Sequence, residues 1–276
     1  MLSITSDYAS GTGCPEPCLR RIADAGFSHV HWCHQWCTDF LYSACETAQI
    51  GRWFRDFGLS LCDVHGSHGK EKAWGSRAEY ERQAGLELIR NRIHFAAELG
   101  ADVVIMHLPG VPADPATDPD FAGRLHDSID SLLPDLAANG VRLAFENMAR
   151  DDFGLIRQLL ADYPADRIGL CYDAGHGNIG DGVGLVHLDG VKDRLIAVHL
   201  HDNDGQSDQH LPPFGGTLDW PALARIIATS SYAKPLSFEV AIRASGIEDE
   251  GEFLALSYRR ARDVADLVSL ERSILA

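Results

Sequence analysis

The fold is decided by four short stretches in the C-terminal half, which read Phe145-Glu146-Asn147, Tyr172-Asp173-Ala174, His199-Leu200-His201 and Phe238-Glu239-Val240. Each stretch closes an apolar run with a side chain that can bind a metal, and these side chains are Glu146, Asp173, His199 and Glu239. In a parallel β/α barrel the carboxyl ends of the strands open at one mouth, so these four strand-end ligands should converge. Three carboxylates and an imidazole suit a divalent cation.

The same pattern of a short apolar run followed by a polar residue occurs eight times along the chain. The runs span residues 2–6, 29–32, 60–65, 103–107, 142–146, 168–173, 196–201 and 236–240. Helical periodicity lies between them, most clearly over 78–99 and 125–136. A doubly wound open sheet would alternate in the same way, but no glycine-rich phosphate loop follows the first run. The pattern predicts an α/β fold, a (β/α)8 TIM barrel, with residues 1–276 as a single domain.

Length and composition exclude several classes of protein. A barrel of this type needs about 250 residues, and the chain has 276. No run of about 18 apolar residues predicts a membrane span, and residues 1–7 do not resemble a secretory signal, so we expect a cytoplasmic protein without a membrane partner. Seven cysteines without a Cys-x-x-Cys pair favour neither a disulfide scaffold nor a cysteine zinc site. A net charge of -16 argues against a nucleic-acid partner.

Histidines gather where the strands are expected to end. Nine of the thirteen do so, namely His31, His34, His65, His68, His107, His176, His199, His201 and His210. Any one of them alone is most simply a hydrogen-bonded histidine at the edge of the core, but their common placement indicates a site. Glu146 could form a buried ion pair with an arginine, yet a carboxylate buried behind four apolar residues is costly unless a cation compensates it. His176 could serve a second metal or hold a substrate hydroxyl.

These strings resemble the xylose isomerase-like TIM barrel superfamily, which contains sugar isomerases and epimerases as well as endonuclease IV. The resemblance spans about residues 60–240 and is carried by Val64-His65-Gly66, Met106-His107-Leu108-Pro109-Gly110, Phe145-Glu146-Asn147, Tyr172-Asp173-Ala174-Gly175-His176, His199-Leu200-His201-Asp202-Asn203-Asp204-Gly205, Asp208-Gln209-His210 and Phe238-Glu239-Val240. The epimerase branch implies one divalent ion on the four strand-end ligands, with His176 at the substrate. Endonuclease IV implies further zinc ligands, which here would be His65, His107, His176, Asp208 and His210.

The resemblance implies an enzyme, a metal-dependent isomerase or epimerase of a small sugar or related polyhydroxy carbonyl compound. The cofactor would be manganese, cobalt, magnesium or zinc, and the reaction would pass through an enediolate with Glu146 and Glu239 as acid and base. An endonuclease IV-like phosphoesterase with more than one zinc ion, or a cyclitol or sugar dehydratase, would use nearly the same site. Net charge favours the sugar-like substrate over DNA.

Further residues are candidates for contact with a sugar-like substrate. Trp32, His201 and Arg243 follow or end predicted strands near the expected mouth. Trp36 and Trp74 could also stack on a ring, although each is equally suited to structural packing. Aromatic residues that look exposed in the sequence would also suit a homo-oligomer.

Overall fold

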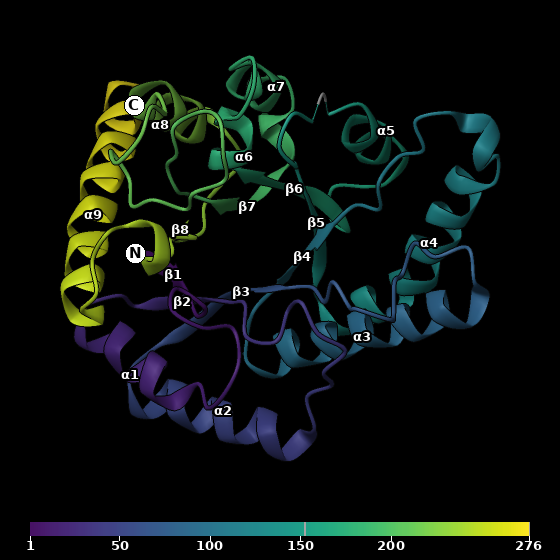
Figure 1. Cartoon of the computed structure of the whole chain (residues 1–276), viewed down its shortest axis with the longest axis horizontal. Helices are drawn as coiled ribbons and strands as arrows, with labels where there is room; N and C mark the ends of the chain where they lie inside the picture. Colours follow the sequence, from purple (N-terminus) through teal and green to yellow (C-terminus); the bar gives the residue numbers. More distant parts are fainter. Residues whose placement is uncertain (152, 276) are drawn as a thin grey trace.

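The computed structural model describes residues 1–151 and 153–275, in which eight parallel strands form a barrel inside a ring of helices (Figure 1). The strands are β1 (Leu2–Thr5), β2 (His29–Trp32), β3 (Ser60–His65), β4 (Val103–His107), β5 (Arg142–Glu146), β6 (Ile168–Asp173), β7 (Leu195–His199) and β8 (Leu236–Phe238). Each strand pairs with the next along the chain from β1 to β7, and β1 also pairs with β8. The barrel closes where Leu200 bridges Phe238. The predicted (β/α)8 TIM barrel is confirmed.

The helices follow the strands and cover the outside of the barrel. They are α1 (Glu16–Asp24), α2 (Ala44–Asp56), α3 (Glu79–Glu98), η1 (Pro115–Thr117), α4 (Phe121–Asn139), α5 (Gly154–Asp162), α6 (Ala174–Asn178), α7 (Gly184–Asp189), η2 (Lys192–Arg194), α8 (Trp220–Thr229), η3 (Ile242–Ala244) and α9 (Glu250–Leu275). Ser43 begins α2 in a capping box with Glu46, and Gly140 ends α4 at φ 63°. Over the described part of the chain, no helix is both long and apolar enough to cross a membrane.

The observed strands differ from the predicted ones chiefly at the mouth. The runs at 29–32, 60–65, 103–107, 142–146 and 168–173 have the expected bounds, whereas β1, β7 and β8 end earlier than predicted. Beyond the end of β8, the Glu239 N–H still donates to the Leu200 carbonyl at 3.2 Å. Glu239 and His201 therefore lie on chain that is leaving the sheet, where their side chains can reach neighbouring strands.

Strand alternation separates the core into two layers. Val104, Phe145 and Val198 belong to the large apolar layer between strands and helices. A smaller cluster consists of Val103, Ile105, Ala144, Cys171, Ile196 and Ala197. Side chains two positions apart share a face of a strand, so most of the smaller cluster lies directly below the residues that end β4 to β7. The fold thus places a floor of small, apolar side chains under the mouth.

Candidate metal centre

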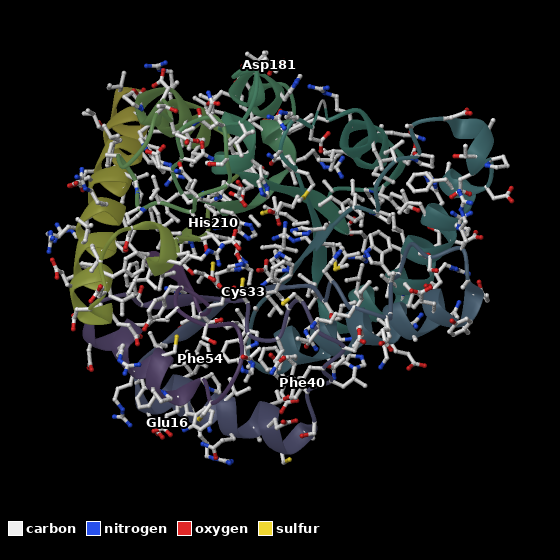
Figure 2. The ribbon with its side chains drawn as sticks, in the orientation of Figure 1. Glu16, Cys33, Phe40, Phe54, Asp181 and His210 are labelled. Carbon is white, nitrogen blue, oxygen red and sulfur yellow. The ribbon has the colours of Figure 1, made fainter. Side chains whose placement is uncertain are left out.

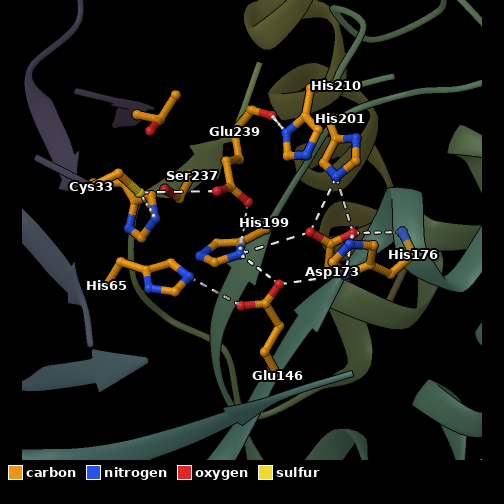
Figure 3. Close-up of polar contacts among 12 residues, drawn as sticks. Cys33, His65, Glu146, Asp173, His176, His199, His201, His210, Ser237 and Glu239 are labelled. Carbon is orange, nitrogen blue, oxygen red and sulfur yellow. Dashed lines mark hydrogen bonds and ion pairs between the residues drawn. The ribbon is translucent and has the colours of Figure 1, made fainter. Parts of the chain in front are cut away.

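The four strand-end ligands meet at one point in the mouth of the barrel (Figure 3). One ligand atom from each lies within 4.8 Å of the others, and the four residues are Glu146, Asp173, His199 and Glu239. His199 Nδ1 is 2.9 Å from Glu239 Oε2, 3.4 Å from Glu146 Oε1 and 3.8 Å from Asp173 Oδ2. The sequence predicted this convergence from strand ends alone.

Strand periodicity explains why these side chains face inward. Glu146 lies two residues beyond Ala144, Asp173 two beyond Cys171, and His199 two beyond Ala197, and all three lower residues belong to the smaller core cluster. Glu239 reaches the same point from just beyond β8. Solvent has little access to these side chains, since Asp173 and His199 are fully buried and Glu146 is 2% exposed.

The donor atoms fit a divalent cation. Both ring nitrogens of His199 and the Oε2 atom of Glu146 are buried and form no well-aligned hydrogen bond among the described residues, although Nδ1 and Oε2 lie at ion-pair distance from Glu239 and His107. Buried polar atoms rarely remain unpaired, because desolvation is not repaid. Three carboxylates close to one imidazole nitrogen are a ligand set that a divalent cation accepts.

The pKa shifts of Glu146 and His199 indicate that the pocket stabilises positive charge. Burial alone would raise the pKa of Glu146, but the charges of His199 and His107 hold it well below its usual range. Burial would likewise lower the pKa of His199, yet Cys171, Glu239 and Glu146 raise it well above normal. Surroundings that favour the charged forms of Glu146 and His199 in this way show that the pocket stabilises positive charge near these carboxylates.

A second set of residues fixes the orientation of Asp173. His201 Nε2 lies 3.0 and 3.1 Å from the two carboxylate oxygens of Asp173, and the His176 backbone N–H donates to Oδ1 at 2.6 Å. The Asn147 side chain accepts from the Asp173 N–H at 2.9 Å and donates to the Asp173 carbonyl at 3.0 Å. Such outer contacts set the direction of a ligating carboxylate.

The further ligands implied by the resemblance also lie around the centre. On one side, His107 Nε2 is 3.2 Å and His65 Nε2 is 3.7 Å from Glu146 Oε2. These three residues form their own group of ligand atoms within 4.8 Å. Burial and the charge of His107 lower the pKa of His65 to about 3, so His65 is neutral and able to ligate at physiological pH.

On the other side, Asp208 lies between two histidines. Its Oδ2 atom is 3.4 Å from His176 Nε2 and 3.0 Å from His210 Nε2. Burial would lower the pKa of both rings, but neighbouring carboxylates raise the pKa of His176 to about 12 and that of His210 to about 9. His210 adopts φ 52°, and its Nδ1 donates to the Glu239 carbonyl at 2.7 Å, so this strained residue ties the loop to the centre.

Two more side chains lie at the mouth: Trp36, which the sequence offered as a residue that could stack on a ring, and Asp7, which it did not single out. Trp36 lies over the rings of His65 and His107, with centroids 4.6 and 5.6 Å away, and its indole N–H donates to Asp7 Oδ2 at 3.3 Å. Asp7 follows β1, and burial with the charge of Glu239 raises its pKa. The strand-end pattern could have indicated Asp7 from the sequence, because Asp7 is also a carboxylate just past a strand.

The three residues proposed for substrate contact occupy different positions. Trp32 is fully buried among Phe54 and Phe95 in the outer core, so its assignment to the substrate is wrong: the strand turns it outward when His31 points inward. His201 is also fully buried and supports Asp173 instead. Arg243 is exposed in η3. Trp74 stacks on Phe145, which leaves Trp36 as the predicted aromatic that reaches the mouth.

Two cavities are lined in part by residues that surround the centre. One of about 320 Å³ runs past Asn147 and His176 to Arg150, Phe153 and His187. The other, of about 260 Å³, runs past His107 to His68, Lys72 and Trp74. Both cavities combine apolar walls with a few polar groups, and the larger has the volume of a small-ligand site.

Comparison with known proteins places the chain in a family. The model of the xylose isomerase-like TIM barrel family matches residues 19–256. The protein y4fM of Sinorhizobium fredii is 32% identical over 247 residues, which cover 80% of this chain and 79% of y4fM. The protein MJ1311 of Methanocaldococcus jannaschii is 27% identical over 176 residues, or 59% of each chain.

Solved structures share the fold at low sequence identity. A D-tagatose 3-epimerase-like protein superposes with a TM-score of 0.79 at 17% identity, covering 100% of this chain and 99% of its own. The 3-keto-D-glucoside 4-epimerase YcjR of E. coli superposes with a TM-score of 0.72 at 18% identity, covering 95% and 100%. The extent of the family match and the identity to y4fM show that the chain belongs to the xylose isomerase-like TIM barrel family.

Proposed function

We propose that the protein is a divalent-metal-dependent isomerase or epimerase that acts on a small sugar or related polyhydroxy carbonyl compound. One observation carries the proposal: Glu146 and Glu239 approach the same nitrogen of His199 from two strands, at 3.4 and 2.9 Å. Two carboxylates are thereby held near one point in a water-poor pocket. Solved structures of the same fold include ones titled as sugar epimerases, which supports this chemistry.

The chain's own residues account for a two-base reaction. Glu146, Asp173, His199 and Glu239 would hold the cation. When bound, it would supply Lewis-acid polarisation of a carbonyl and an adjacent hydroxyl. One glutamate removes the proton from the carbon beside the carbonyl, and the other returns a proton to the opposite face. His176, between Glu146 and Asp208, lies where it can hold a substrate hydroxyl.

The surroundings favour an uncharged, sugar-sized substrate. Trp36 offers an aromatic face at the mouth, and the adjoining cavities hold about 320 and 260 Å³. The loop beyond β7 carries Asp202, Asp204 and Asp208, so the position where barrels commonly bind phosphate is acidic.

Solvent exchange tests the proposal. Glu146→Gln and Glu239→Gln should each slow the exchange of the substrate's α-hydrogen with deuterium by about 10²- to 10⁴-fold, because each removes one proton carrier. Glu87→Gln, on the exposed face of α3, is the matched control and should exchange at the wild-type rate. Full exchange in both active-site variants would exclude the two-carboxylate scheme. Loss of water from the substrate, seen by mass, would assign the same site to a dehydratase.

A multi-zinc phosphoesterase is the second candidate, and a specific arrangement favours it. His65 and His107 lie near Glu146 while Asp208 joins His176 and His210, so all five additional ligand types surround the centre. A phosphoesterase predicts that His107→Asn binds fewer zinc ions than wild type and loses hydrolysis of an aryl phosphodiester. The isomerase predicts equal zinc content in the two proteins and no such hydrolysis in either.

A further inference from the structure

The two carboxylate oxygens of Glu239 face different partners. Oε2 lies 2.9 Å from His199 Nδ1, within the four strand-end ligands. Oε1 lies 3.9 Å from the thiol sulfur of Cys33 (Figure 3). That sulfur is 2.9 Å from Nε2 of His31. Cys33 is fully buried. In the view of Figure 2, Cys33 and His210 lie toward the middle of the molecule, whereas Glu16 and Asp181 lie at its edge. Glu239 therefore connects the metal centre to a buried thiol and imidazole.

Asp63 sets the tautomer of the His31 imidazole beside Cys33. Its Oδ1 atom lies 2.6 Å from His31 Nδ1, and both side chains are fully buried. Because an ionised carboxylate only accepts hydrogen bonds, Nδ1 carries the proton and the lone pair lies on Nε2, toward Cys33. A carboxylate behind the imidazole is the usual support of a metal-binding histidine.

The donors suit a cation with an affinity for sulfur. Ligand atoms of His31, His199 and Glu239 lie within 4.8 Å of one another. The Cys33 sulfur adjoins this group, at 2.9 Å from His31 and 3.9 Å from Glu239. A thiolate, an imidazole and a carboxylate are ligands of zinc and cobalt, whereas magnesium prefers oxygen. The buried carboxylates of Asp63 and Glu146, together with the partly exposed carboxylate of Glu239, add negative charge that a second dication would compensate.

We propose that His31, Cys33 and Glu239 bind a second divalent cation, such as Zn²⁺ or Co²⁺, with Glu239 bridging it to the four strand-end ligands. Binding breaks the Cys33 S–H bond: the sulfur electron pair is donated to the cation, and the proton leaves to solvent. Neither His65 nor His107 takes part, so the site is separate from the group that those residues form with Glu146. It is also independent of which reaction the protein catalyses.

Titration of the metal-free protein with Co²⁺ tests the site directly. Wild type should develop the intense near-ultraviolet absorption of thiolate-to-cobalt charge transfer, and Cys33→Ser should lose both that band and one bound ion. Cys171→Ser is the matched control, because Cys171 is another fully buried thiol close to His199. Its band should persist.

A third variant separates this site from the neighbouring one. Asp173→Asn weakens the four strand-end ligands without changing the thiol site, so its charge-transfer band should remain. Absence of the band in fully reduced wild type at saturating Co²⁺ would overturn the proposal without any variant and would leave Cys33 as a hydrogen-bond donor to His31. Loss of the band in Cys171→Ser with its retention in Cys33→Ser would also overturn it.

Discussion

His201 directs Nε2 at both carboxylate oxygens of Asp173, at 3.0 and 3.1 Å, and neither side chain is exposed to solvent. The ring also stacks on His210, with centroids 4.1 Å apart. This arrangement makes His201 a positioning residue for one of the proposed ligands.

His201→Asn should therefore weaken cation binding by about 10- to 100-fold, the usual effect of losing the support of a ligand. Isothermal titration with Mn²⁺ measures it. His94→Asn changes an exposed histidine on α3 and is the control. Unchanged affinity in a folded His201→Asn would show that Asp173 does not ligate or needs no support.

Gly175→Ala tests the same contact from the other side. A Cβ at Gly175 would overlap the Cε1 and Nδ1 atoms of the His201 ring, so the ring must move off Asp173. We expect a loss of about 1–3 kcal/mol in the free energy of unfolding, together with weaker Mn²⁺ binding. Gly123→Ala, exposed on α4 with open space at its Cβ, should instead stabilise by up to about 1 kcal/mol. Equal effects of the two changes would contradict the packing.

Asp102 predicts a pH dependence of stability. Burial alone would raise the pKa of Asp102, but Lys234 and Arg142, the latter at 2.8 Å, lower it below 3.8. A carboxyl whose pKa is lower in the folded state stabilises above its unfolded pKa and loses that contribution as pH falls through the folded value. Urea unfolding should find Asp102→Asn less stable by at most about 1 kcal/mol at pH 7, with the difference shrinking toward pH 2–3. A constant difference would contradict the ion pairs.

Metal removal should destabilise the protein. Three carboxylates share the centre, so the folded state gains binding energy from a cation that the unfolded chain lacks. A cation at 100 times its Kd adds about 2.7 kcal/mol, or about 5 to 10 °C in Tm for a domain of this size. Differential scanning fluorimetry with a chelator and then with Mn²⁺ checks this. A Tm that neither treatment changes would argue against the site.

The sequence was most informative where one rule sufficed, namely that the carboxyl ends of parallel strands meet at the mouth of a barrel. Glu146, Asp173 and His199 end inward-facing strand positions, so the barrel itself brings them together. Asp63 was missed because it lies inside β3, although its separation of two residues from His65 places both on the inward face. Trp32 was misassigned because the alternation that turns His31 inward was not applied to its neighbour.

The path of the loop after β7 could not be predicted from the sequence. Asp208 and His210 reach the centre only because the chain after β7 folds back, with Asp202 bridging Leu211 and His210 at φ 52°. Strand periodicity does not reach such a segment, and its path depends on contacts with β8 that are distant in sequence. The gathering of histidines near strand ends pointed to His210, and the resemblance indicated both residues as ligands.

Anomalous diffraction from crystals grown with Mn²⁺ tests the central claim most directly. We predict a peak within about 2.0–2.3 Å of one ligand atom each from Glu146, Asp173, His199 and Glu239. An ordered mouth with these four side chains clear in density and no anomalous peak among them, or with manganese bound only elsewhere, would contradict the account.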